Sequence, residues 1–155
     1  MRIAVMGTGG TGGFFGGLLA RTGEDVTFIA RGAHLDAIRR HGLTVRSQLL
    51  GDFTVAAKAT DDPTEVGVVD LVLFCVKAYD NDTAIPAIRP LVGRDTMVLS
   101  VQNGIDNEDL IARVVGSRAV LGAMAGVSAV IPAPDRKSTR LNSSHIQKSR
   151  MPSSA

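Results

Sequence analysis

The stretch MRIAVMGTGGTGGFFGGLLARTGEDVTFIAR, residues 1–31, decides the fold. Its first apolar run, Arg2 to Met6, predicts a short strand. Apolar residues at helical spacing follow the glycines and predict a helix that ends near Gly23. The run Asp25 to Ala30 predicts a second strand. The order strand, glycine turn, helix, strand indicates an α/β unit built on a parallel sheet.

The same alternation continues to Pro134. The nearly continuous apolar run VDLVLFCV (69–76) predicts a strand covered by helices on both faces. The remaining predicted elements are a strand over 97–101, a strand over 119–121, helices over 33–41, 82–88 and 107–115, and a hairpin of 43–47 with 53–57 outside the main repeat. We therefore expect an α/β fold with a Rossmann-type, doubly wound, mostly parallel sheet over residues 1–134.

The glycine turn is a candidate phosphate-binding loop. Gly7, Thr8, Gly9, Gly10, Thr11 and Gly12 fit the pattern G-x-G-x-x-G between a predicted strand and a predicted helix. Gly7 would permit the tight turn, Gly9 would let a pyrophosphate approach the backbone, and Gly12 would let the helix pack against the strand. The free N–H groups at the helix start favour an anion. The alternative is a tight turn that serves helix packing alone.

The end of the second predicted strand indicates which dinucleotide binds. A domain specific for NAD would carry Asp or Glu there, to accept hydrogen bonds from the ribose hydroxyls. This chain has Ala30-Arg31 instead. A guanidinium suits the 2′-phosphate of NADP(H), so we expect NADP(H) with Arg31 as its reader. His34 and His41 have no acidic partner at useful spacing, and we expect both on the surface.

Two further polar sites follow buried strands. Lys77 comes directly after the run 69–76, and Asn103 follows the run 97–101 after Gln102. In an open α/β sheet ligands bind at the carboxyl ends of the strands. An ammonium suits a carboxylate or phosphate, and an amide suits a ribose hydroxyl or a carbonyl. The alternatives are a lysine that merely enters solvent and an Asn103-Gly104 turn.

Composition excludes several classes of protein. The 155 residues are 45% apolar and 21% charged, which indicates a packed core. Residues 1–134 hold 12 basic and 14 acidic side chains, so we expect no nucleic-acid partner. We expect neither a membrane span nor a secretory signal. The single cysteine, Cys75, cannot form an internal disulfide and fits a reducing, cytoplasmic compartment. No metal site is expected.

The segment 135–155 differs from the rest of the chain. It lacks an apolar period and holds five basic residues against one acid, Asp135. Its runs DRKSTRLNSSH (135–145) and SRMPSSA (149–155) resemble, in one reading frame, translated sequencing-adapter DNA. We expect a disordered, non-native tail after a domain that is truncated at Pro134. The alternative is a natural Ser/Arg-rich tail.

The residues quoted above resemble the amino-terminal half of the ketopantoate reductase (2-dehydropantoate 2-reductase) family. The resemblance runs from Met1 to about Pro134 and includes LVLFCVKAYD, SVQNGIDNEDLIA and VLGAMAGVSA. Lysine-alanine after the fourth strand and Gln-Asn-Gly after the fifth are its specific marks. It implies that residues 7–12 bind the NADPH phosphates and that Arg31 binds the 2′-phosphate.

The resemblance further implies supporting catalytic roles for two residues near the nicotinamide. Lys77 and Asn103 would both line the nicotinamide end of the cofactor site, where Lys77 has a positioning role and Asn103 contacts ribose and substrate. Ala129 would lie in a loop beneath the nicotinamide. The family continues into a second, helical domain that supplies a general-acid lysine, and this lysine is absent from the 155 residues.

The expected function is therefore the NADPH-dependent reduction of 2-dehydropantoate to pantoate in pantothenate and coenzyme A synthesis. This chain would be the cofactor-binding half, inactive alone. The alternatives are a reductase of another 2-keto acid and a non-catalytic NADP-binding module. A small 2-keto acid is the expected partner, and a homodimer stays open for the full-length protein.

Overall fold

The computed structural model describes residues 1–126, 128–133 and 136–140. The strands are β1 (Arg2–Met6), β2 (Asp25–Ile29), β3 (Leu43–Ser47), β4 (Phe53–Val55), β5 (Lys58–Thr60), β6 (Leu71–Phe74), β7 (Met97–Ser100), β8 (Val120–Gly122), β9 (Ser128–Ala133) and β10 (Arg136–Arg140). The α-helices are α1 (Gly10–Arg21), α2 (Gly32–His41), α3 (Asn81–Ala87) and α4 (Asn107–Val115). Four 3₁₀ turns join them: η1 (Pro63–Glu65), η2 (Ala78–Asp80), η3 (Arg89–Leu91) and η4 (Ser117–Ala119).

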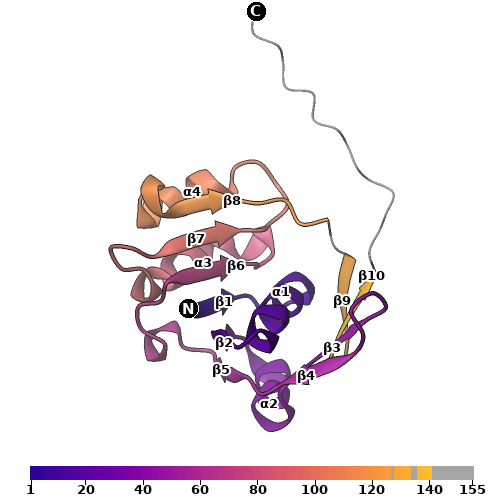
Figure 1. The fold of residues 1–155 in the computed structure, drawn as a ribbon. Coiled ribbons are helices and arrows are strands. Elements are labelled where there is room, and N and C mark those ends of the chain that lie inside the picture. The colour runs from indigo at the N-terminus through magenta and orange to yellow at the C-terminus, as the bar shows by residue number, and fades with distance from the viewer. Residues whose placement is uncertain (127, 134–135, 141–155) are drawn as a thin grey trace, which may run out of the picture.

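Six strands form the main sheet, in the order β5-β2-β1-β6-β7-β8 (Figure 1). Every neighbouring pair in it is parallel. The chain starts at β1, moves outward through β2 to β5, then returns to β6 on the other side of β1 and continues to β8. The strand order therefore reverses between β1 and β6, which is the crevice where open α/β sheets bind ligands.

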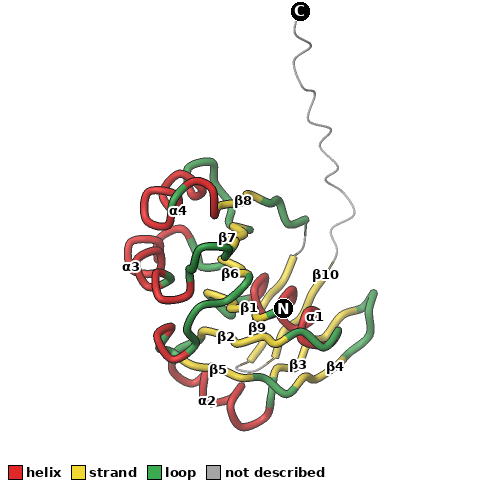
Figure 2. Tube along the Cα trace, turned by 60° about the vertical axis from the view of Figure 1, so that its left-hand side comes forward, coloured by secondary structure: helices red, strands yellow, loops and turns green. Residues whose placement is uncertain are grey.

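Helices cover both faces of the main sheet, and each face has its own core. On one face, α3 supplies Ile85, the residue after α3 is Ile88, and α4 supplies Ile111, and all three pack in a cluster with Phe74 and Val98. The opposite face packs against α1 and α2, and Figure 2 shows α1 on the far side of the sheet from α3 and α4. Burial on both faces explains why the central strands are continuously apolar.

A second sheet, in the order β4-β3-β10-β9, covers the outer side of α1. Helix α1 therefore lies between two sheets. A methyl group added at Gly16 would lie 2.6 Å from the Phe28 ring of the main sheet. One added at Gly17 would lie 2.9 Å from Val45 of the second sheet. The glycines of α1 thus allow both sheets to approach the helix closely.

Most predicted elements are confirmed within one or two residues at their ends. The predicted hairpin exists, because β3 and β4 pair antiparallel. The sequence analysis missed β5, which adds a sixth parallel strand beside β2. Only three residues long, β5 carries too little apolar pattern to be recognised. Among the described residues, no helix has the length and apolar character needed to cross a membrane.

The structure differs from the expectation of disorder at the start of the segment 135–155. Residues Arg136–Arg140 form β10, which pairs parallel with β3 and antiparallel with β9. The edge of β3 offers unpaired backbone groups, and a strand forms there with little help from side chains. Residues 141–155 lie outside the described part. The adapter origin of the segment stays a prediction.

Candidate functional site: a groove along the carboxyl ends of the parallel strands

The glycine loop joins β1 to α1 with the geometry that the motif requires. Gly7 has φ of +93°, a conformation that favours glycine. A methyl group at Gly12 would collide with the carbonyl oxygen of Gly7, so Gly12 brings the helix close to the loop. Space beside Gly9 is open instead, with no atom of a described residue within 4 Å of an added methyl group. Gly9 therefore presents bare backbone toward the groove, beside the start of α1.

Thr8 and His34 anchor this loop to its neighbours. The buried Thr8 hydroxyl donates to the carbonyl oxygen of Ile29 over 2.9 Å, so the Thr8 side chain points toward β2. Nε2 of His34 lies 2.8 Å from the Thr8 carbonyl oxygen. Because a carbonyl can only accept, Nε2 carries a proton and donates. His34 is partly buried against the loop, so the expectation of a surface residue was wrong in its case.

Arg31 lies at the adenosine end of the predicted site. It is the exposed N-cap residue of α2, directly after the end of β2. Together with Gly9 and His34 it lines a cavity of about 240 Å³. The Arg31 guanidinium makes no hydrogen bond or ion pair with any described residue. A positive charge at the end of β2 without a partner in the described part of the chain is available to an anionic ligand.

Lys77 and Asn103 lie together across the groove. With Gly9, Gly10 and Thr11 they line a second cavity of about 460 Å³. Both residues are exposed, and neither side chain has a hydrogen bond or ion pair within the described part of the chain. The structure thus brings the glycine loop and the two predicted polar residues to one cavity.

The cavities join into one groove along the carboxyl edge of the sheet. The Arg31 cavity and the Lys77 cavity share Gly7, Gly9, Val76 and Asp80 as lining residues. The Lys77 cavity shares Gln102, Asn103 and Ala125 with a third cavity of about 380 Å³ near β8. The groove therefore extends from the end of β2, across the switch point between β1 and β6, to the end of β8.

Ala129, the last predicted site residue, lies in the second sheet. It belongs to β9, where its backbone lies opposite Thr139 of β10. Its side chain lies outside the part of the chain that the structure describes. Ala125, four residues earlier, is a small residue of the same segment that lines two of the cavities.

Sequence reasoning missed a chain of three amides behind Asn103, of which two are buried and one is partly buried. Gln102, Asn81 and Asn107 are linked by hydrogen bonds, and the last of them binds the carbonyl oxygen of Asn103. Asn81 and Asn107 begin α3 and α4. A polar residue at the first position of each helix after a groove-forming loop is the signal that could have found them.

Cys75 contributes no reactive thiolate to the groove. It lines the Lys77 cavity, but most of its surface is covered. Burial raises the pKa of the Cys75 thiol to about 12. The thiol therefore stays protonated near neutral pH and packs against the glycine loop as a small apolar group.

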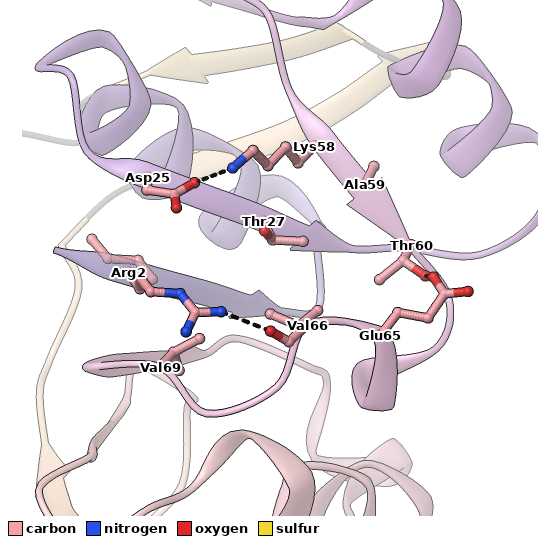
Figure 3. Close-up of a pocket in the computed structure, with 10 residues that line it drawn as sticks. Arg2, Asp25, Thr27, Lys58, Ala59, Thr60, Glu65, Val66 and Val69 are labelled. Carbon is pink, nitrogen blue, oxygen red and sulfur yellow. Dashed lines mark hydrogen bonds and ion pairs between the residues drawn. The ribbon is translucent and has the colours of Figure 1, made fainter.

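Another cavity, of about 300 Å³, lies at the opposite, amino-terminal edge of the main sheet (Figure 3). Its charged and polar groups pair with one another. Lys58 Nζ lies 2.6 Å from Asp25 Oδ1, and Arg2 Nη2 donates to the carbonyl oxygen of Val66 over 2.9 Å. Thr60 donates to Glu65 in the same cavity. The charged side chains of this cavity are therefore already occupied, unlike those of the groove.

The groove fits an extended dinucleotide. Gly9 leaves space for a phosphate against the backbone, at the amino end of a helix of twelve residues. The Arg31 guanidinium, which has no partner among residues 1–126, 128–133 and 136–140, lies at one end of the groove, and the Lys77 ammonium and Asn103 amide lie at the other. Among the described residues no group of His, Cys, Asp or Glu is placed to hold a metal ion.

Comparison with known proteins agrees with this arrangement. The family model for ketopantoate reductase, PanE/ApbA, matches residues 3–145. The chain belongs to this family. It is 40% identical over 134 residues to the 2-dehydropantoate 2-reductase of Pyrococcus horikoshii, covering 86% of this chain and 42% of that protein. The match to the family model continues eleven residues past Pro134, into the segment that was expected to be non-native.

Solved structures of the family have the same fold. The 2-dehydropantoate 2-reductase of Geobacter metallireducens superposes with a TM-score of 0.85 at 38% identity, over 89% of this chain and 46% of that one. A D-mandelate dehydrogenase solved with NADH and anilino(oxo)acetate superposes with a TM-score of 0.82 at 27% identity, over 89% of this chain and 45% of that one. This chain thus spans less than half the length of these relatives.

Proposed function

We propose that the protein reduces 2-dehydropantoate to pantoate with NADPH and that this chain forms its cofactor-binding half. The continuous groove from Arg31 through the glycine loop to Lys77 and Asn103 carries the proposal. NADPH, when bound, supplies the hydride. The family match and the relatives named 2-dehydropantoate 2-reductase support the choice of reaction.

Each part of the groove has a binding task in this proposal. The Arg31 guanidinium holds the 2′-phosphate through bidentate, charge-assisted hydrogen bonds. The backbone of residues 7–12 and the start of α1 hold the pyrophosphate. The Asn103 amide orients the ribose and the keto acid, because it can both donate and accept. The Lys77 ammonium attracts the carboxylate of the keto acid.

Reduction of a ketone also needs a proton at the developing alkoxide and the exclusion of water. Lys77 is exposed in this chain, and we assign it positioning rather than proton transfer. We place the general acid in the part of the protein that the relatives contain and this chain does not. The 155 residues alone are therefore expected to bind the cofactor without turnover. The lone buried Cys75 fits a cytoplasmic location.

A second candidate is the reduction of a different 2-keto acid. The D-mandelate dehydrogenase favours it, because that protein of the same fold is named for a different acid and was solved with NADH and anilino(oxo)acetate. At the level of this chain, cofactor preference tests only the NADH part of this candidate, since Arg31 suits a 2′-phosphate and a bare ribose hydroxyl does not need it.

Thermal unfolding of the 155-residue chain with each nucleotide tests the cofactor assignment. At a concentration a hundred times its Kd, NADPH should stabilise the fold by about 2.7 kcal/mol and raise the Tm by about 5 to 10 °C. NADH at the same concentration should protect less. Equal protection by both would remove the argument from Arg31, and protection by neither would end the assignment. Oxidation of NADPH by 2-dehydropantoate with this chain alone would contradict the predicted lack of turnover.

A further inference from the structure

The loop that carries Asn103 is held from behind by a line of side-chain amides. Gln102 Nε2 donates to the carbonyl oxygen of Val76 over 2.9 Å and to Asn81 Oδ1 over 2.7 Å. Asn81 Nδ2 donates to Asn107 Oδ1 over 2.9 Å. Asn107 Nδ2 donates to the carbonyl oxygen of Asn103 over 3.0 Å. The line therefore connects Val76, in the loop that follows β6, to Asn103, in the loop that follows β7.

The direction of every hydrogen bond in this line is fixed. A backbone carbonyl can only accept, so the amide nitrogens of Gln102 and Asn107 must face Val76 and Asn103. Asn81 must then accept from Gln102 and donate to Asn107. Both asparagines are 5% exposed, so water cannot easily replace a lost partner. An amide cannot flip without breaking two bonds in a buried place.

The line also crosses from one helix to another. Asn81 begins α3 and Asn107 begins α4, while Gly104 lies between Asn103 and α4 with φ of +124°. A methyl group at Gly104 would lie 2.8 Å from Asn107 Nδ2. The close approach of the Asn107 amide to the loop is thus built into the turn as well as into the side chains.

We propose that Asn81 and Asn107 are positioning residues that set the place of Asn103 in the groove. The inference rests on the proposed function, in which Asn103 contacts the bound nucleotide. Neither asparagine is among the residues that line the cavities holding Lys77 and Asn103. They act through the Asn103 backbone, and they join its position to the packing of α3 against α4.

A double-mutant cycle on the 155-residue chain tests the proposal. The Kd for NADPH is measured by calorimetry for the wild type, Asn107→Leu, Asn103→Ala and the double variant. Asn107→Leu alone should weaken binding about three- to tenfold, the value of one to two hydrogen bonds. In the Asn103→Ala background the same change should alter the Kd less than twofold, because the side chain that Asn107 positions is gone.

Thr96→Val is the matched control. The Thr96 hydroxyl is equally buried, donates to the Val69 carbonyl oxygen over 2.6 Å and accepts from the Gly93 N–H, at the amino end of β7. Its loss should lower the Tm and leave the Kd within twofold. A residue with a merely structural role behaves like Thr96, so Asn107→Leu with lowered Tm and unchanged Kd overturns the proposal.

A second substitution covers the case in which Asn107→Leu does not fold. Asn107→Asp keeps the acceptor for Asn81 and cannot donate to Asn103. Its added charge would weaken nucleotide binding equally in the Asn103→Ala background, whereas lost positioning would not. Equal losses in both backgrounds therefore refute the positioning role while the cofactor assignment stands. Failure of the folded wild type to bind NADPH or NADH overturns both the proposed function and this inference.

Discussion

The two edges of the main sheet carry similar charged side chains and use them differently. At the amino edge, Lys58 pairs with Asp25, and Arg2 binds the Val66 carbonyl oxygen. At the carboxyl edge, Arg31 and Lys77 have no such partner among the described residues. Both edges are hollowed: the amino edge holds a cavity of about 300 Å³, and the carboxyl edge holds the longer groove. The presence of a cavity therefore does not distinguish a binding site here, whereas the state of its polar groups does.

This difference follows from the topology. All six strands of the main sheet are parallel, so each edge collects only one kind of strand end. The carboxyl edge also collects the start of α1 with its free N–H groups, and the reversal of strand order there opens a crevice. The amino edge has no equivalent, and its charges stabilise the ends of neighbouring strands.

The largest expected effect is a loss of stability at Gly12, where the helix packs closely against the glycine loop at the carboxyl edge. Gly12→Ala would press a methyl group against Gly7, and against Cys75 at 3.0 Å. Overpacking of this kind should cost about 1 to 3 kcal/mol of stability. Chemical denaturation with circular dichroism measures the loss. A midpoint equal to that of the wild type would show that the loop yields easily.

Arg31→Ala should come next, with an effect on binding and little on stability. Loss of charge-assisted hydrogen bonds to the 2′-phosphate should weaken NADPH binding by about 1.5 to 3 kcal/mol and leave NADH nearly unaffected. Fluorescence titration with each nucleotide gives the ratio of the two Kd values.

The control for Arg31 is Arg39→Ala on the same helix. Arg39 donates to the Ala59 carbonyl oxygen over 2.9 Å and is thus occupied within the fold. Removal of the Arg39 side chain should leave the ratio of the Kd for NADPH to the Kd for NADH unchanged. If both variants raise this ratio equally, the preference comes from the general charge of α2 and not from Arg31.

Gly9→Ala should have a smaller effect. In contrast to Gly12→Ala, it should weaken nucleotide binding and leave stability nearly unchanged. The space beside Gly9 accepts a methyl group within the protein, so the stability should change by less than about 0.5 kcal/mol. The same methyl group would occupy space needed by a phosphate, and NADPH binding should weaken by about 1 kcal/mol or more. Calorimetric titration measures the binding. Unchanged affinity would place the phosphates elsewhere.

The smallest effect is expected at the amino edge, for Lys58→Ala. The hydrogen bond from Lys58 lowers the pKa of the Asp25 carboxyl below its usual value. A lowered pKa gives stability that is present above the ordinary pKa and is lost as the pH falls through the lowered one. The variant should therefore melt slightly below the wild type at pH 6, and the two should converge in acid.

Nucleotide affinity provides the check on that variant. It should not change, because the pair lies at the far edge of the sheet from the groove. A weaker Kd for NADPH in Lys58→Ala would break the proposed division between a stabilising edge and a binding edge.

The sequence predicted the parts of this molecule that local pattern determines. The glycine loop, the central parallel strands, and Lys77 and Asn103 after them follow from apolar runs and from the first polar residue beyond each run. Strand β5 was missed because three residues carry no period. Arg136–Arg140 form a strand where disorder was expected. A strand added to the β3 edge is selected mainly by backbone pairing, which leaves no apolar period in the sequence.

The amide line could not be predicted, since it depends on distance between segments. Asn81 and Asn107 are 26 residues apart, and each looks in sequence like an ordinary helix start. Only the packing of α3 beside α4 brings them together. His34 was misassigned for the same reason, because its partner is a backbone oxygen, which leaves no mark in the sequence.

The position of α1 between two sheets has a consequence for the thermodynamics of ligand capture. A helix held on both sides has few alternative orientations, so its amino end is already aimed before any anion arrives. The glycine loop, residues 7–12, should then lose little conformational entropy when the nucleotide binds. Backbone amides of α1 should accordingly be among the slowest in the chain to exchange with deuterium, with or without nucleotide.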